Sequence, residues 1–190
     1  MRVVKESFIA TTEERGSKFI AHLCPYAKFE TLMHSLKSTH PKAVHFVYAY
    51  RYINEFDQIV ENSSDDGEPR GTSGKPALSA LAGADLVDSA VIVVRYFGGT
   101  KLGTGGLVRA YSSSVNAVID VATTHEYKKV QTVVLKCGYD ELRVVEYTLE
   151  QENIKVTNKS FDEAVLLHLE LSSDELEHLR SKLPRSVDLS

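Results

Sequence analysis

The sequence predicts an α+β protein of two domains, and three observations support that prediction. Short β-prone runs alternate with amphipathic helical runs along most of the chain. The polar stretch Thr123–Lys129 interrupts this alternation, after which the order strand, helix, strand, strand, helix follows. A chain of 190 residues, 43% hydrophobic and 25% charged, suits one large or two small folded units. We therefore place the domain boundary at Glu126, between domains of residues 1–126 and 127–190.

The first predicted domain contains the clearest strands. Residues Ala43–Ile53 alternate, with Tyr48 and Tyr50 on one face and Val47 and Ala49 on the other. The run Ala90–Val94 is apolar throughout, as expected of a strand buried on both faces. A hairpin is expected over Val3–Cys24, and helices are expected where apolar residues recur with helical spacing, around residues 29–36, 78–86 and 107–122.

The second predicted domain follows the order of a ferredoxin-like unit, βαββα, with a closing strand in doubt. Its strands are expected at residues 130–135, 154–156 and 164–171, and its helices at 142–149 and 172–183. Ser172 and Glu175 have the spacing of a capping box. The fourth strand has to lie in Arg185–Ser190, which is so short that the strand is expected to be truncated or missing.

Composition excludes several kinds of protein. The net charge of −4 argues against a chain that coats nucleic acid by charge alone, although a local basic patch is compatible with it. Two cysteines, Cys24 and Cys137, cannot form a disulfide framework or a four-cysteine zinc site. The longest apolar run is far shorter than the roughly 20 residues that span a bilayer, so we expect a cytoplasmic protein without a membrane partner.

The glycine-rich segment Gly98–Gly106 is the first candidate site. It joins a buried strand to a long helix, whose first N–H groups lack internal partners and attract anions. Lys101 and Arg109 add positive charge, and Thr104 is expected to cap the helix. The segment is neither a Walker A motif nor a dinucleotide fingerprint, so its glycines serve either an anion site or only a tight turn. The candidate ligand-binding residues are Gly98, Gly99, Lys101, Gly103, Thr104, Gly105, Gly106 and Arg109.

The polar loop Ser63–Pro76 is the second candidate site. Its carboxylates are able to bind Mg²⁺ through water and substrate phosphates, or to form hydrogen bonds with a partner. Alternatively, the loop is a solvated turn whose carboxylates pair with Arg70. No metal site or cofactor is assigned. The candidate ligand-binding residues are Asp65, Asp66, Glu68, Arg70, Thr72 and Lys75.

Arg95, Tyr96 and Phe97, at the end of the buried strand, form a third candidate. An arginine beside two aromatic residues is able to stack on a base or to bind phosphate or carboxylate. The alternative is that the aromatic residues belong to the core and Arg95 pairs with the acidic loop. No nucleophile–base pair is evident, because the histidines lack metal-ligand spacing and no Gly-x-Ser-x-Gly occurs. Catalytic residues are therefore not assigned.

Two blocks of sequence resemble a known family. The first block is DDGEP, residues 65–69, followed by Gly71, Thr72, Gly74 and Pro76. The second block is RYFGGTKLGTGGLVRAY, residues 95–111. Together they resemble the IMPACT family, in its bacterial YigZ-type branch, over residues 17–121. Ser17–Ile20, His45 and Tyr48–Arg51 also resemble this family. The resemblance implies an N-terminal domain with the fold of elongation factor G domain IV and a ferredoxin-like C-terminal domain. It also implies a link to translational control, in which eukaryotic relatives act, but no catalytic residues. Ser73 stands where alanine is commoner in the family.

We expect a regulatory binding protein whose two loops, Ser63–Pro76 and Gly98–Gly106, lie together and bind RNA, the ribosome or a translation-related protein. A rival hypothesis is an enzyme acting with Mg²⁺ on a phosphorylated small molecule or nucleotide. A third is a protein-interaction module without an ionic ligand. The first two require the loops to be neighbours in space and the cations Arg95 and Lys101 to be reachable. The residues expected to contact phosphate or carboxylate are Lys75, Arg95, Lys101 and Arg109.

Overall fold

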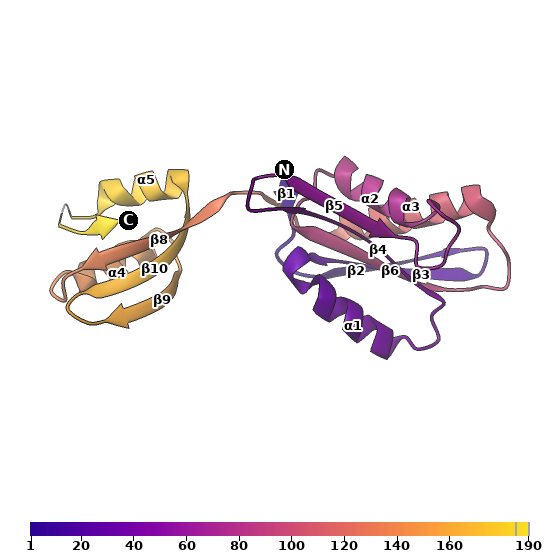
Figure 1. Ribbon diagram of the computed structural model, residues 1–190, viewed down its shortest axis with the longest axis horizontal. Helices are drawn as coiled ribbons and strands as arrows, with labels where there is room; N and C mark the ends of the chain where they lie inside the picture. Colours follow the sequence, from indigo (N-terminus) through magenta and orange to yellow (C-terminus); the bar gives the residue numbers. More distant parts are fainter. Residues whose placement is uncertain (185, 190) are drawn as a thin grey trace. The chain divides into compact units, whose positions relative to one another are not determined.

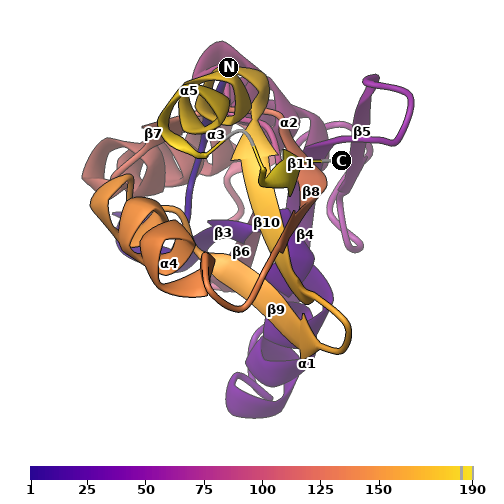
Figure 2. The same ribbon diagram turned by 90° about the vertical axis from the view of Figure 1, so that its left-hand side faces the viewer.

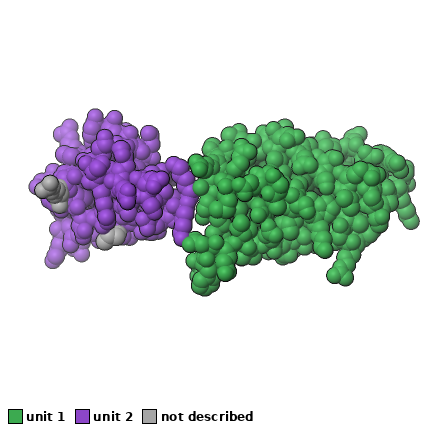
Figure 3. Space-filling view, turned by 90° about the horizontal axis from the view of Figure 1, so that it is seen from above, with its two compact units in different colours: residues 1–127 green, residues 128–190 purple. Residues whose placement is uncertain are grey.

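A computed structural model describes residues 1–184 and 186–189, and the chain divides into two compact units, Met1–Tyr127 and Lys128–Ser190 (Figure 3). Each unit combines helices with an antiparallel sheet, which confirms the predicted α+β class. The parts of the expected closing strand at Arg185 and Ser190 lie outside the described residues. Among the helices of the described residues, none is long and apolar enough to cross a membrane.

The larger unit is built on a five-stranded antiparallel sheet with the order β2-β3-β6-β4-β5 (Figure 1). Strand β5 is not among the predicted strands, because its sequence is largely polar and it pairs with β4 alone at the sheet edge. A short pair, β1 (Arg2–Val3) and β7 (His125–Glu126), joins the two ends of this unit. The strands of the large sheet are β2 (Phe8–Glu14), β3 (Ser17–Pro25), β4 (His45–Ile53), β5 (Ile59–Ser64) and β6 (Ser89–Tyr96).

Helices cover both faces of this sheet (Figure 1). After the 3₁₀ turn η1 (Tyr26–Lys28), α1 (Phe29–Thr39) covers one face, and α2 (Gly74–Gly83) and α3 (Gly103–Val121) cover the other. The central strand β6 supplies Val91 and Val93 to the core under α2 and α3, and Ala90, Ile92 and Val94 to the core above α1. All five side chains are inaccessible to solvent, which confirms the prediction of a strand buried on both faces.

The smaller unit has the strand order β11-β8-β10-β9, which is the ferredoxin-like order, with α4 and α5 on one side of the sheet (Figure 2). The closing strand β11 is short but present, and it pairs antiparallel with β8. The predicted capping box opens α5, since Ser172 accepts from the Glu175 N–H and the Glu175 carboxylate accepts in return. The elements are β8 (Val130–Cys137), α4 (Leu142–Gln151), β9 (Val156–Phe161), β10 (Val165–Ser172), α5 (Ser173–Lys182) and β11 (Asp188–Leu189).

Candidate functional site

One row of residues crosses three strands at the end of the large sheet. Arg95 on β6 is paired in register with Phe19 on β3 and with His45 on β4. Residues opposite each other in an antiparallel pair point to the same face of the sheet. Along β6 this is the face of Val91 and Val93, so the row of Phe19, Arg95 and His45 lies on the side covered by α2 and α3.

A buried ion pair joins this row to the acidic loop. The Arg95 guanidinium donates to the Glu68 carboxylate, and only 5% of Arg95 and 9% of Glu68 are exposed. The Tyr111 hydroxyl on α3 donates to the same carboxylate oxygen at 2.8 Å, and the Tyr111 ring meets Phe19 edge to face. Burial, and then the neighbouring Glu68 carboxylate, raises the pKa of Tyr111. The alternative prediction, that Arg95 pairs with the acidic loop, is therefore what the structure shows. The expectation that Arg95 is reachable and contacts a phosphate is wrong, because its side chain is buried against Glu68.

Asp65 binds the start of α2. Its carboxylate accepts hydrogen bonds from the N–H groups of Gly71, Ser73 and Gly74, at 2.7, 3.1 and 2.8 Å, and from the Ser73 hydroxyl at 2.8 Å. Burial by itself raises the pKa of Asp65, but these four donors outweigh it and hold that pKa below its usual value. Asp65 thus acts as a remote cap of the helix.

Asp66 binds strand β4 instead. Its carboxylate accepts from the Phe46 N–H at 2.6 Å, and its backbone carbonyl lies 2.6 Å from Nδ1 of His45. The three carboxylates of the acidic loop therefore diverge, toward α2, toward β4 and toward Arg95. Within residues 1–184 and 186–189, no three His, Cys, Asp or Glu side chains are placed to hold a metal ion together.

His45 is oriented by the same contact. A carbonyl oxygen can only accept, so Nδ1 of His45 has the proton and donates it to the Asp66 carbonyl. This leaves Nε2 facing the buried cluster, 3.7 Å from the Glu68 carboxylate. The ring thus joins the acidic loop to the strand while one nitrogen remains directed at Glu68.

The glycine-rich segment is fixed at Gly98. A Cβ atom added to Gly98 would lie 1.9 Å from the carbonyl carbon of Gly16, so only glycine allows this approach to the β2–β3 turn. The Gly98 N–H also donates to the Ser17 hydroxyl at 3.1 Å. Gly99 then takes a φ of +84°, which favours glycine as well. Gly98 thus serves a close approach of two backbones, and the alternative that glycines serve a tight turn applies to Gly99 and to Gly103, whose φ is +70°.

The start of α3 is different, because it is open. Leu102 occupies the N-cap position and supplies no side-chain hydrogen bond, so the prediction that Thr104 caps the helix is wrong; Thr104 lies in the first turn. A Cβ atom added to Gly103 would meet no atom within 4 Å. Lys101 precedes this turn, is exposed, and has no ion pair with any described residue. Free N–H groups and an unpaired ammonium therefore lie next to each other.

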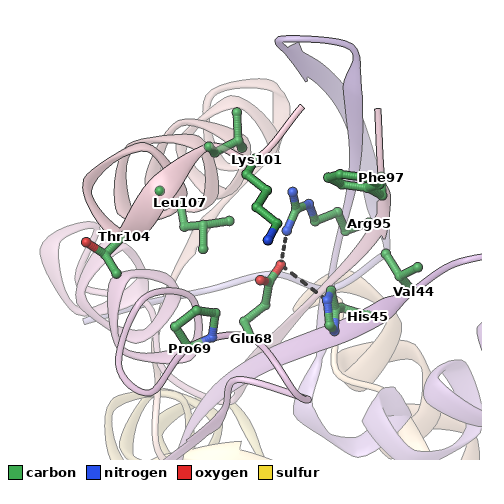
Figure 4. Close-up of a pocket in the computed structure, with 11 residues that line it drawn as sticks. Val44, His45, Glu68, Pro69, Arg95, Phe97, Lys101, Thr104 and Leu107 are labelled. Carbon is green, nitrogen blue, oxygen red and sulfur yellow. Dashed lines mark hydrogen bonds and ion pairs between the residues drawn. The ribbon is translucent and has the colours of Figure 1, made fainter. Parts of the chain in front are cut away.

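A pocket of about 500 Å³ lies between the two loops. Figure 4 shows Glu68 between Arg95 and His45, with the Lys101 side chain extending toward the same space. Two exposed apolar side chains, Val44 and Phe97, each 50% exposed, form part of its wall. The two candidate loops thus share one neighbourhood. The lining residues are Val44, His45, Glu68, Pro69, Arg95, Phe97, Lys101, Leu102, Gly103, Thr104 and Leu107.

Several predicted site residues lie elsewhere. Tyr96 points to the opposite face of the sheet, where its hydroxyl lies 2.8 Å from Nδ1 of His40, because successive strand residues alternate. Arg109 lines a separate pocket of about 230 Å³ beside the β2–β3 turn, together with Gly106. Thr72 is buried and donates to the Pro69 carbonyl.

The remaining predicted residues are exposed and lie outside the pocket lining. Arg70 and Lys75 are exposed in the acidic loop and at the start of α2. No described carboxylate pairs with Arg70, so the alternative of a turn held by Arg70 is wrong. Gly105 lies in the first turn of α3, where an added Cβ atom would meet only the Arg109 guanidinium, at 3.7 Å.

Some site residues are missing from the predicted set. His45 has no metal-ligand spacing, but it lies within the clearest predicted strand, Ala43–Ile53, and is the first residue of β4. Tyr111 follows Leu107 by four residues on one face of α3, which is a signal that it points the same way. Ser17 is placed at the site only by strand pairing, which no local pattern reveals.

The fold and the pocket together define a class: an α+β protein of two units with a small pocket, basic on one side and apolar on the other. Known families agree with this class. The Impact N-terminal domain model matches residues 15–119, which include both loops, and a domain of unknown function, DUF1949, matches residues 135–185. The chain belongs to the IMPACT family.

Similar proteins span nearly the whole chain. An IMPACT family member of Haemophilus influenzae is 36% identical over 95% of this chain and 89% of its own length. The Escherichia coli family member YigZ is 35% identical over 90% of this chain and 85% of its own. A crystal structure described as that of a hypothetical protein is 32% identical, with a TM-score of 0.73 over 99% of this chain and 95% of that one.

Proposed function

We propose that this protein is a regulatory binding protein that engages RNA, free or within the ribosome, through the pocket between the two loops. One observation supports the proposal. Lys101 and the open start of α3 lie in the same pocket as an apolar wall formed by Val44 and Phe97. The resemblance to the IMPACT family, with its eukaryotic members in translational control, favours a partner in translation.

RNA suits both halves of this surface. Its phosphates are attracted by an unpaired lysine and by free N–H groups at a helix start, and its unstacked bases pack against aromatic and apolar side chains. The net charge of −4 requires that such binding be local rather than spread over the surface. A translation-related protein is the other candidate partner, and the experiment below separates the two.

The rival hypothesis of a Mg²⁺-dependent enzyme, in which Asp65, Asp66 or Glu68 binds Mg²⁺ or acts as base, has less support. Asp65 caps α2, Asp66 binds β4 and Glu68 pairs with Arg95, so the three carboxylates do not converge on one ion. The pocket geometry therefore favours binding over phosphoryl chemistry based on these residues.

The test is the binding of a fluorescent oligouridylate and of ribosomes, measured at several salt concentrations. We expect the affinity for the oligouridylate to fall at least tenfold between about 50 and 200 mM salt. Lys101→Ala should weaken binding and reduce the salt dependence, whereas Lys37→Ala, an equal change of charge on α1 and outside the pocket, should do neither. Ribosome binding should fall in parallel.

Three results contradict the proposal. A flat response to salt, or no binding at low salt, removes RNA as the partner. If ribosomes or a translation factor still bind after nuclease treatment and Lys101→Ala has no effect, the partner is a protein that uses another surface. Arg95→Ala is unsuitable as a probe, because it would leave Glu68 buried without its partner.

A further inference from the structure

Two cations of the pocket face a single carboxylate. Arg95 is neutralised by Glu68, whose charge is also held by the Tyr111 hydroxyl, and Lys101 has no ion pair among the described residues. The pocket therefore has a surplus positive charge beside the first turn of α3. A ligand group placed there should be an anion.

Arg95 is not the free cation of the pocket. Its side chain lines the pocket, but only 5% of the residue is exposed, and its Nη1 and Nη2 groups are bonded to Glu68 and Ser17. Its Nε has no hydrogen-bond partner among the residues that the structure describes, but this atom is closed to solvent, so a ligand does not reach it. The exposed Lys101 is therefore the cation that is left to bind an anion. Figure 4 shows this guanidinium facing the same space as Lys101.

The opposite wall selects the rest of the ligand. Phe97 and Val44 are each 50% exposed, and Pro69, Leu102 and Leu107 continue the apolar lining. A half-exposed aromatic ring next to an anion site fits a planar group attached to the anion. The pocket volume of about 500 Å³ lies within the range that holds a small organic ligand, roughly 300–1,000 Å³.

We propose that the pocket binds one nucleoside phosphate unit, with its phosphate against Lys101 and the first turn of α3 and its base against Phe97 and Val44. This inference deepens the proposed function, since one source of the unit is an RNA chain, and the other source is a free nucleotide. Gly103 lines the pocket with a φ of +70°, which favours glycine, and nothing would lie within 4 Å of an added Cβ atom, so the helix N–H groups that follow are open to a phosphate.

The experiment uses the full chain and four probes: uridine monophosphate, uridine, inorganic phosphate and a short oligouridylate. Binding is measured by titration with amide NMR signals recorded. Uridine monophosphate should bind at least tenfold more tightly than uridine or phosphate and should shift the signals of Gly103 and Gly105. Lys101→Ala should lower that affinity roughly tenfold, through loss of a charged hydrogen bond, and Phe97→Ala roughly tenfold, through loss of stacking.

Matched variants show whether these losses belong to the pocket. Lys37→Ala and Phe56→Ala remove an exposed lysine of α1 and a 72% exposed phenylalanine that do not line the pocket, so each should change the affinity less than twofold. If uridine binds as tightly as its monophosphate, the anion subsite is refuted. If phosphate binds as tightly as the nucleotide, or if the signals of Gly103 and Gly105 do not move, the inference is also overturned.

The oligouridylate identifies the source. Tighter binding of the oligomer than of the mononucleotide, with the same loss in Lys101→Ala, supports the pocket as part of an RNA site. Equal binding supports a free nucleotide as the ligand, so the inference stands while the proposed RNA function fails. Oligomer binding that is unaffected by Lys101→Ala and Phe97→Ala overturns the inference but leaves RNA binding at another surface.

Discussion

The acidic loop and the glycine-rich segment meet at one pocket, yet they use their polar groups in opposite ways. In the acidic loop the carboxylates of Asp65, Asp66 and Glu68 are bound by the protein's own N–H, hydroxyl and guanidinium groups. In the glycine-rich segment, Lys101 and the first N–H groups of α3 have no such partners among the described residues. A conspicuous charge in a sequence thus indicates a ligand site only if the fold leaves that charge unpaired.

The difference has a physical reason. A carboxylate that is buried without donors is costly, so each acid that the loop places near the core has to be satisfied internally. Lys101 remains exposed, and the free amides of a helix start are tolerated next to water or a ligand. The acidic loop therefore builds the pocket, and the glycine-rich segment presents the groups that are free to bind.

The largest expected effect is that of Glu68→Gln, which tests whether the acidic loop is structural. The variant leaves Arg95 buried without a counter-ion, so the free energy of unfolding should fall by about 3–5 kcal/mol. Urea titration followed by NMR signals of residues 1–127 measures it. Glu55→Gln, at an exposed site, should change that free energy by less than about 0.5 kcal/mol. A loss below about 1 kcal/mol for Glu68→Gln would contradict the internal role of Glu68.

The next largest effect on stability is expected at Gly98, where substitution by alanine should be far more costly than at Gly105. Gly98→Ala places a Cβ atom 1.9 Å from the carbonyl carbon of Gly16, so it should destabilise the protein by about 3 kcal/mol or more. Gly105→Ala meets only ordinary contact and should be neutral, or stabilising by up to about 1 kcal/mol, since alanine favours helix. Thermal unfolding compares the two. Equal effects of the two substitutions would contradict the division of this segment into a part that is held against the β2–β3 turn, at Gly98, and an open start of α3.

Asp65→Asn should have the smallest of these effects, about 1 kcal/mol at neutral pH, because it weakens a helix cap. The pKa of Asp65 is lowered in the folded protein. Its contribution is therefore complete above the unfolded pKa of about 3.9 and is lost as the pH falls through the lower folded pKa.

Urea titrations from pH 7 downward test this pH dependence. Wild type and Asp65→Asn should differ by a constant amount above about pH 5 and converge at lower pH. Asp120→Asn, at an exposed position of α3, is the control, and its free energy of unfolding should stay close to that of wild type at every pH. A difference that grows as the pH falls would show that the Asp65 carboxylate is not stabilised by its four donors.

The sequence predicted much of the fold because its signals are local. Alternation in Ala43–Ile53, the apolar run Ala90–Val94 and the capping box at Ser172 each depend on residues a few positions apart, and each is confirmed. Strand β5 escaped prediction, because its stability comes from pairing with β4 rather than from its own composition. The prediction that Arg95 and Tyr96 belong to one site is wrong, because neighbouring residues on a strand point to opposite faces of the sheet.

The α+β class, the two candidate loops and the long helix after the glycine-rich segment follow from backbone preference and periodicity, which are local properties of the chain. Which charges stay free, and that the start of α3 is open, depends on how the chain folds. Pairing partners such as Arg95 and Glu68 lie 27 positions apart, and Ser17 lies 78 positions from Arg95. Distances of that kind are set by strand register and packing, so the pocket and its surplus positive charge exist only in the folded chain.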